Sequence, residues 1–440
     1  MEDNNAGGNF DPRRLQYMLK LSDLCKGRFP VGLFYFDKEL WTEEGVRDAA
    51  DTGADFFVAV ESSEILINLC KKHELGIISN SNITPFWWGG DGKKAGTYTK
   101  EFPPERIDEI NNYPSSPVLW GDYFVDEPNS KDFTHIDKVI KQYKKRFPGK
   151  LPFINLYPNY GRIPNLRSEE IILELGNLSY QEHIDRYLQC IDLPYICFDY
   201  YPFTGSFLTY LENLDTITKA CKKSNKEMWV IIQAGAWKSE DILDAHQLDW
   251  QVYMCLAYGA KAIIFASYSK GWLDQNTSCV NLKGEKNKTY EYVKIISSVL
   301  HSPLGTDFLK YEYIYTKAFG DIDSSDERIR MQLERQNITE QNKSEKLTDL
   351  PDIKIKSDRA VVTGFFKKDD GYALMIVNTH NPFDSSVAAN VKIETDSLKK
   401  INILSVEKTE SHFKPSIESS AVELIIHSGQ AAFLTIQDKK

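Results

Sequence analysis

Two adjacent carboxylates, Asp126 and Glu127, stand in the stretch GDYFVDEPNS, directly after an apolar and aromatic run and directly before a proline. Two like charges placed side by side repel each other and lose solvation, which usually raises the pKa of one of them. A carboxyl group with a raised pKa can donate a proton at neutral pH, as general acid catalysis requires. The pair therefore predicts acid–base chemistry at a strand end. The plainer alternative is that either residue caps the next helix or forms a salt bridge.

The elements that must position this pair alternate along the chain. Eight short runs rich in β-branched and aromatic residues are separated by segments with the apolar period of an amphipathic helix. The runs cover 31–36, 55–60, 75–80, 121–126, 151–157, 195–201, 228–234 and 261–268. Eightfold alternation of apolar strands with helices predicts an α/β fold, a (β/α)8 TIM barrel. An open doubly wound sheet is less favoured, because no glycine-rich phosphate turn follows the first strand.

The pattern changes after about residue 303. A charge-dense stretch near 320–352 contains few apolar residues and predicts a polar loop or insert. Beyond it, runs with period-two alternation and turn residues between them predict a small antiparallel β-sandwich. We therefore expect a flexible leader and first helix over 1–28, the barrel over 29–302, and the β-sandwich domain over 303–440.

Other strand ends of this barrel carry residues suited to a sugar pocket. In a TIM barrel the reacting groups lie at the C-terminal ends of the strands. Pyranose rings offer an apolar C–H face and a rim of hydroxyls, so aromatic, amide and carboxylate side chains are the expected lining. The candidates for substrate binding are Trp87, Trp88, Asn155, Tyr157, Tyr200, Tyr201, Gln233, Trp237 and Tyr268. With Asp199 at the sixth strand as a third carboxylate beside Asp126 and Glu127, this set suits cleavage of a glycosidic bond.

Five motifs carry a resemblance to a known group of proteins. VDEPN, LPFINLYP, FDYYPF, IIQAGAW and WQVYMCLAYGAKAIIFASYS follow the fourth to eighth strands in order. Together they resemble bacterial glycoside hydrolase barrels, particularly β-galactosidase-like proteins of polysaccharide-degrading gut bacteria, over about residues 30–302. The tail is similar to the small β-domain that often ends such enzymes. The resemblance implies hydrolysis of O-glycosidic bonds in an oligo- or polysaccharide.

One departure from that pattern concerns the second carboxylate. Retaining enzymes with this barrel carry an acid/base Glu after the fourth strand, usually preceded by Asn, and a nucleophilic Glu at the end of the seventh. The resemblance maps the first role onto Glu127, but Asp126 precedes it and the seventh strand ends in Gln233.

Three mechanisms remain open for the partner of Glu127. Asp126 could orient a 2-acetamido group of the substrate that attacks its own anomeric carbon, which resembles the adjacent Asp-Glu pair of some hexosaminidase barrels. Alternatively, Glu127 or Asp126 could work with Asp199 as the second carboxylate, with the spacing deciding between retention and inversion. Glu240 or Asp241 could return to the site from the next loop, which we favour least because these residues are expected to begin a helix.

Two other classes of function stay in view. A barrel without one expected carboxylate also fits a catalytically inactive carbohydrate-binding protein, because a fold alone implies no activity. Convergence of Asp126, Glu127 and Asp199 within about 10 Å would favour an enzyme, and salt bridges that occupy them would favour binding. A lyase or isomerase is favoured less, since few of the Lys, Tyr/His or metal-ligand patterns for such chemistry stand at the strand ends.

Composition excludes several partners. The net charge of −10 over 440 residues, without a basic stripe, argues against nucleic acid. No apolar run reaches the ~18–20 residues that span a bilayer, so we expect no membrane span. The chain contains no P-loop, nucleophile elbow or metal-ligand spacing, so we predict neither cofactor nor metal. The seven scattered cysteines predict reduced core residues.

The sequence leaves two properties open. The start MEDNNAGGNF lacks a basic region followed by an apolar one, so it does not predict a signal peptide. Localisation therefore stays unknown, and an exported protein is the alternative if a signal peptide was removed. The oligomeric state is likewise unknown.

Overall fold

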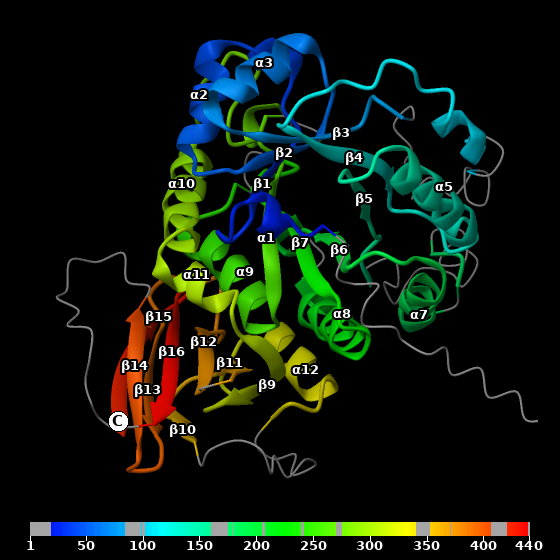
Figure 1. Ribbon diagram of the computed structural model, residues 1–440. Coiled ribbons are helices and arrows are strands. Elements are labelled where there is room, and N and C mark those ends of the chain that lie inside the picture. The colour runs from blue at the N-terminus through cyan, green and yellow to red at the C-terminus, as the bar shows by residue number, and fades with distance from the viewer. Residues whose placement is uncertain are drawn as a thin grey trace, which may run out of the picture.

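The computed structural model describes residues 19–83, 98, 102–159, 175–177, 179–204, 207–238, 242–269, 275–339, 353–369, 371–405 and 420–438. Its first half is a barrel of eight parallel strands, as predicted (Figure 1). The strands are β1 (Val31–Phe34), β2 (Phe56–Val60), β3 (Gly76–Ser79), β4 (Leu119–Asp126), β5 (Leu151–Asn155), β6 (Tyr195–Tyr200), β7 (Glu227–Gln233) and β8 (Ala260–Ala266). All eight predicted runs are confirmed as strands.

Parallel pairing closes the barrel. Strands β1 to β4 each pair with the next strand in sequence, as do β6 and β7, and β1 pairs with β8. The remaining seam, between β5 and β6, is joined by the parallel bridge Leu156↔Phe198. The backbone N–H of Leu156 donates to Cys197 O at 2.8 Å across this seam. The C-terminal ends of β4, β5 and β6, which carry the predicted carboxylates, are therefore neighbours.

Helices cover the outside of the barrel. They are α1 (Leu21–Leu24), α2 (Glu43–Asp51), α3 (Glu64–His73), α5 (Phe133–Arg146), α7 (Tyr180–Cys190), α8 (Tyr210–Ser224), α9 (Ala245–Ala257), α10 (Lys288–Leu300) and α11 (Pro303–Phe308). Side-chain hydrogen bonds cap the N-termini of several helices. The hydroxyl of Thr42 accepts from Gly45 N–H at the start of α2, and that of Ser63 accepts from Leu66 N–H at the start of α3. Among helices within the described ranges, none combines the length and apolar character needed to cross a bilayer.

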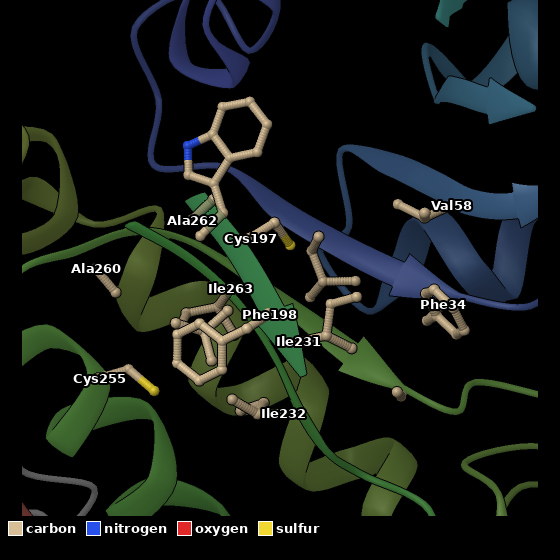
Figure 2. Close-up of a cluster of buried hydrophobic side chains, with 14 of the residues drawn as sticks. Phe34, Val58, Cys197, Phe198, Ile231, Ile232, Cys255, Ala260, Ala262 and Ile263 are labelled. Carbon is tan, nitrogen blue, oxygen red and sulfur yellow. The ribbon is translucent and has the colours of Figure 1, made fainter. Parts of the chain in front are cut away.

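One hydrophobic core joins the strands to these helices. Figure 2 shows part of it, with Phe34 of β1, Val58 of β2, Phe198 of β6, Ile231 of β7 and Cys255 of α9 among the labelled side chains. All seven cysteines are free, and all but Cys190 are buried. Long apolar runs are needed in these strands because both faces of a parallel barrel sheet are buried.

The second half is an antiparallel β-domain of two sheets. The strands are β9 (Glu312–Phe319), β10 (Lys354–Ser357), β11 (Val361–Lys368), β12 (Gly371–Asn378), β13 (Ala388–Glu394), β14 (Lys399–Ser405), β15 (Ala421–His427) and β16 (Ala431–Asp438). One sheet has the order β10-β13-β15 and the other β14-β16-β12-β11-β9. A second apolar cluster, with Phe365, Val391 and Leu434 among its members, lies between the sheets. The predicted β-sandwich is therefore confirmed.

The stretch near 320–352 contains a helix that the sequence did not predict. Glu327–Arg335 form α12, which buries Ile329, Gln332 and Leu333. Gln332 Nε2 donates to Phe207 O at 2.9 Å, and its Oε1 accepts from Leu211 N–H at 2.8 Å. These contacts fasten α12 to the start of α8. The expected domain boundaries at 29 and 303 stay predictions.

Candidate active site at the barrel mouth

The two adjacent carboxylates lie where the sequence placed them, at the C-terminal end of β4. The strand ends at Asp126, and Glu127 follows in the left-handed region, with φ of +48°. Such a conformation is uncommon for a residue with a side chain and is found repeatedly at functional sites. The Glu127 N–H donates to Asn155 O at 2.8 Å, which holds this turn to the end of β5.

Asn155 joins two of the three predicted carboxylates. Its Nδ2 donates to Asp126 Oδ1 at 2.9 Å and to Asp199 Oδ1 at 2.7 Å. The thiol of Cys197 donates weakly to Asn155 Oδ1 at 3.8 Å, which fits an amide turned with its nitrogen toward the acids. Asn155 and Asp199 are buried, whereas Asp126 is partly exposed. One amide therefore links the ends of β4, β5 and β6.

Burial and mutual repulsion shift the protonation of these acids. Loss of solvation raises the pKa of Asp126, and the hydrogen bonds from Tyr123 and Asn155 oppose that rise. Desolvation first, and then the charge of Asp126, raise the pKa of Asp199 from 3.8 to about 7. Hydrogen bonds from Asn155 and Tyr201 work in the opposite direction. The Asp126–Asp199 pair is thus arranged to hold a proton near neutral pH.

Two tyrosines that the sequence did not single out belong to this site. The Tyr123 hydroxyl donates to Asp126 Oδ1 at 2.5 Å. Tyr35, just past the end of β1, also has a left-handed backbone, with φ of +63°. Burial, followed by the charges of Asp126, Glu127 and Asp199, raises the pKa of its phenol. Tyr35 therefore lies close to all three predicted catalytic acids. Tyr35 falls inside the predicted run 31–36, and its place near the C-terminal end of that run was the available signal.

The predicted aromatic and amide residues divide between the mouth and the outer layer. Tyr201 lies beside Asp199, to which it is hydrogen-bonded. Tyr200 instead points toward the helices: its hydroxyl contacts Thr209 Oγ1 at 2.8 Å, and its ring centre lies 5.0 Å from that of Tyr210, with the two rings tilted by 60°. Successive strand residues face opposite sides, so Asp199 and Tyr200 cannot both face the barrel interior.

Two more candidates lie at the ends of β7 and β8. Gln233 is buried, and its Oε1 accepts from Phe203 N–H at 3.0 Å. Its Nε2 has no hydrogen-bond partner within the part of the chain that the structure describes. Tyr268 is buried close enough to Tyr290, Asp48 and Asp51 for these groups to raise its pKa further. That environment belongs to α2 and α10 on the outside of the barrel.

For the remaining predicted residues, the structure gives either the exposure of the side chain alone or no description. Tyr157 is half-buried against the core, and Trp237 is 37% exposed. Trp87 and Trp88 lie outside the described residues, as do Glu240 and Asp241. The roles of all these residues in substrate binding or catalysis stay predictions. Within the described ranges, no group of three or more His, Cys, Asp or Glu side chains is arranged to hold a metal ion.

Known proteins resemble this chain in fold only at a distance. No protein-family model matches it, and no curated protein matches its sequence. A candidate α-L-fucosidase from Bacteroides thetaiotaomicron is 13% identical, with a TM-score of 0.42 over 61% of this chain and 94% of that one.

Two further structures give similar values. A glycoside hydrolase family 5 mannosidase from Rhizomucor miehei is 10% identical, with a TM-score of 0.43 over 62% of this chain and 93% of that one. An intracellular xylanase from Thermoanaerobacterium saccharolyticum is 12% identical, with a TM-score of 0.41 over 62% and 97%. These similarities are too distant to bear on activity, and the barrel is established by the strand pairing of this chain.

Proposed function

We propose that this protein is a glycoside hydrolase that cleaves O-glycosidic bonds of an oligo- or polysaccharide. In this proposal Glu127 is the general acid, and Asp126 or Asp199 is its partner carboxylate. The observation that carries the proposal is the amide of Asn155, which holds two desolvated carboxylates together beside a third at the barrel mouth. Paired carboxylates with pKa values pushed apart by their surroundings are the usual machinery of glycosidases.

The distance between Asp126 and Asp199 bears on the stereochemistry of the reaction. Both Oδ1 atoms accept from the same nitrogen, at 2.9 and 2.7 Å. They cannot be farther apart than these two distances added together, which is less than the ~6.5–9.5 Å between the carboxyl groups of inverting enzymes. Asp126 and Asp199 are therefore too close together to leave room for an attacking water between them. With Glu127 as the acid and either Asp126 or an acetamido group of the substrate as the nucleophile, we expect a two-step reaction that retains the anomeric configuration.

Between the two aspartates, Asp126 is better placed to meet a substrate. Both of its hydrogen bonds reach Oδ1, so within the described residues Oδ2 has no hydrogen-bond donor. The residue is also partly exposed, whereas Asp199 is only 4% exposed and bonded to Asn155 and Tyr201. We assign Asp126 the contact with substrate and Asp199 the role of a positioning residue that tunes the charge of Asp126.

The proposed reaction then has two steps. Glu127 gives its proton to the glycosidic oxygen as the bond to the anomeric carbon breaks, and a nucleophile forms a new bond to that carbon. The nucleophile is either the Asp126 carboxylate or a 2-acetamido oxygen of the substrate whose N–H is held by Asp126. Water, deprotonated by Glu127, next attacks the anomeric carbon and releases the sugar.

A panel of chromogenic glycosides tests this function. The panel should contain both anomers of common hexosides, pentosides and 2-acetamido sugars, with the wild type and Asp126→Asn assayed side by side. We expect the wild type to hydrolyse at least one glycoside, and Asp126→Asn to lose roughly 10²-fold or more in kcat/KM. Binding of sugars without release of any aglycone would reject hydrolysis and leave the inactive carbohydrate-binding barrel.

A further inference from the structure

A cavity lies at the opposite end of the barrel from the acids. Its volume is ≈ 480 Å³, within the range of small-molecule sites. It is lined by the C-terminal end of α8, the first residues of β7 and β8, and the start of β9. Since the predicted catalytic residues stand at the C-terminal ends of the strands, this cavity is separate from the proposed active site.

Lysines dominate the charge of this cavity. Those that line it are Lys20, Lys222, Lys226, Lys261, Lys310 and Lys367. Among the described residues that line the cavity, the carboxylates are Glu227 and Glu312. Lys20 is paired with Glu227 at 2.9 Å, and Lys310 with Asp307 at 2.7 Å. Even with these pairs formed, positive charge remains in excess over negative charge around the cavity.

Lys261 is held at this cavity by neutral groups. Its Nζ donates to Tyr311 O at 2.7 Å and to Phe308 O at 3.2 Å, and it lies 4.6 Å from the centre of the Phe308 ring. No carboxylate within the described part of the chain forms an ion pair with it. Burial lowers the pKa of Lys261 to about 8, because a desolvated ammonium group is costly, and the charges of Glu227 and Glu312 only partly oppose this shift.

Lys222 places a second ammonium group at the same cavity. Its Nζ donates to Ile314 O of β9 at 2.6 Å, which uses one of three donors. Carbonyl groups orient Lys222 and Lys261 without neutralising them. Two lysines held by neutral acceptors around a cavity form a preorganised site for negative charge.

We propose that this cavity, which we call the basal cavity, binds a small oxyanion through Lys222 and Lys261. The chemical class is a phosphate or phosphate ester, because a doubly charged oxyanion would compensate both ammonium groups at once. The anion could be free or carried on a sugar, and the volume accommodates either. This inference does not depend on the proposed hydrolase function, since no residue of the barrel mouth takes part.

Calorimetric titration tests the proposal with inorganic phosphate and with glucose 6-phosphate, in a buffer of low ionic strength so that screening is small. The variants are Lys222→Gln, Lys261→Met and Glu227→Gln, with Lys71→Gln on the exposed face of α3 as the matched control. We expect one site per chain in the wild type. Lys222→Gln and Lys261→Met should weaken it roughly tenfold each, as for loss of one charge-assisted hydrogen bond.

The remaining variants separate this cavity from nonspecific anion binding. Glu227→Gln removes a lining carboxylate and should tighten binding, whereas Lys71→Gln should leave it unchanged. This comparison holds even if Lys261→Met fails to fold. Binding of phosphate alone would identify a free anion, and binding of both probes would admit a sugar-borne phosphate. Absence of binding to the wild type, or equal affinity in wild type, Lys222→Gln and Glu227→Gln, would overturn the proposal.

Discussion

Asn155 shows how one neutral side chain can organise several charged ones. Its amide nitrogen serves two carboxylates, while its backbone carbonyl receives the N–H of Glu127. One residue at the end of β5 therefore holds all three acids in position relative to one another. Hydrogen bonds to an ionised carboxylate lower its pKa, whereas burial raises it, and for Asp199 burial dominates.

The raised pKa of Asp199 predicts a dependence of stability on pH. The folded protein holds a proton at this carboxyl up to about pH 7, whereas its ordinary pKa is 3.8. The stabilising contribution is therefore fully present below about pH 4 and is lost as the pH rises through about 7. Asp199→Asn, which is neutral throughout, should exceed the wild type in unfolding free energy at about pH 8, by up to about 4 kcal/mol.

Denaturant titrations at about pH 4 and pH 8 measure this difference. The gap between Asp199→Asn and wild type should shrink toward the lower pH. Asp323→Asn, at an exposed site of the β-domain segment, is the control and should show no such trend. A pH-independent gap for Asp199→Asn would mean that the carboxyl is ionised in the folded protein across this range.

At the scale of elements, contact between β4 and β5 sets the geometry of the mouth. Gly121 of β4 stands opposite Leu151 of β5, and a β-carbon at Gly121 would lie 1.9 Å from Leu151 O. No side chain fits without separation of the two strands. The same two strands end in Asp126 and Asn155, five and four residues farther along the chain. The glycine therefore helps to bring the amide and the acid together.

Gly121→Ala should disturb both stability and activity. We expect a loss of about 1–3 kcal/mol in unfolding free energy, as for overpacking in a core, together with a fall in kcat/KM. Thermal unfolding and the glycoside assay measure the two effects. Unchanged stability would show that β4 and β5 tolerate a wider separation, and full activity would show that the mouth does not depend on their close contact.

The barrel strands were predictable because each is a continuous apolar run, but elements such as β9 and α12 were not. In β9, with the sequence EYIYTKAF, one glutamate and one lysine weaken the apolar pattern, although this edge strand pairs with β11. In α12, Ile329 and Leu333 are the few apolar residues that a short helix needs, and Gln332 is buried through hydrogen bonds. Local composition does not reveal such tertiary partners.

For the candidate site, the sequence indicated which strand ends carry the acids but not which way the neighbouring side chains point. Strand ends identified Asp126, Glu127 and Asp199, because barrel topology gathers those ends at one face. The direction of each tyrosine was not predictable, since it depends on where a strand ends and which face each residue takes. Tyr201 thus lies with Asp199 and Tyr200 with α8, although the two are adjacent. Tyr35 was overlooked because it looked like the continuation of an apolar run.

At the scale of the molecule, the β-domain is joined to the barrel through a shared core. The five-stranded sheet is apolar on both faces: Phe365 and Leu434 face the other sheet, whereas Phe366 and Phe433 belong to the barrel's core. The last two pack around Phe308 of α11, at 5.0 and 5.7 Å between ring centres. Figure 1 shows this domain below α9 and α11. We therefore expect the wild type to unfold in one transition.

Gly364 is one point of close backbone contact at this junction. A β-carbon at Gly364 of β11 would lie 2.1 Å from Ala257 O at the end of α9. Gly364→Ala should push the sheet away from α9 and cost about 1–3 kcal/mol. Thr363→Val is the matched control: it replaces a buried hydroxyl that has no hydrogen-bond partner in the described part of the chain. Denaturant unfolding should show a loss for Gly364→Ala alone, and equal midpoints for both variants would argue against tight docking.

The central claim, that Glu127 protonates the departing oxygen, is tested most directly by the dependence of rate on the leaving group. Glu127→Gln should be compared with wild type and with Glu44→Gln, a control in which the side chain is 79% exposed in the wild type. Aryl glycosides with acidic phenols need little protonation, so Glu127→Gln should slow them only slightly, whereas poor leaving groups should lose roughly 10²–10⁴-fold in kcat/KM. An equal loss for all leaving groups, or no loss, would contradict the assigned role of Glu127.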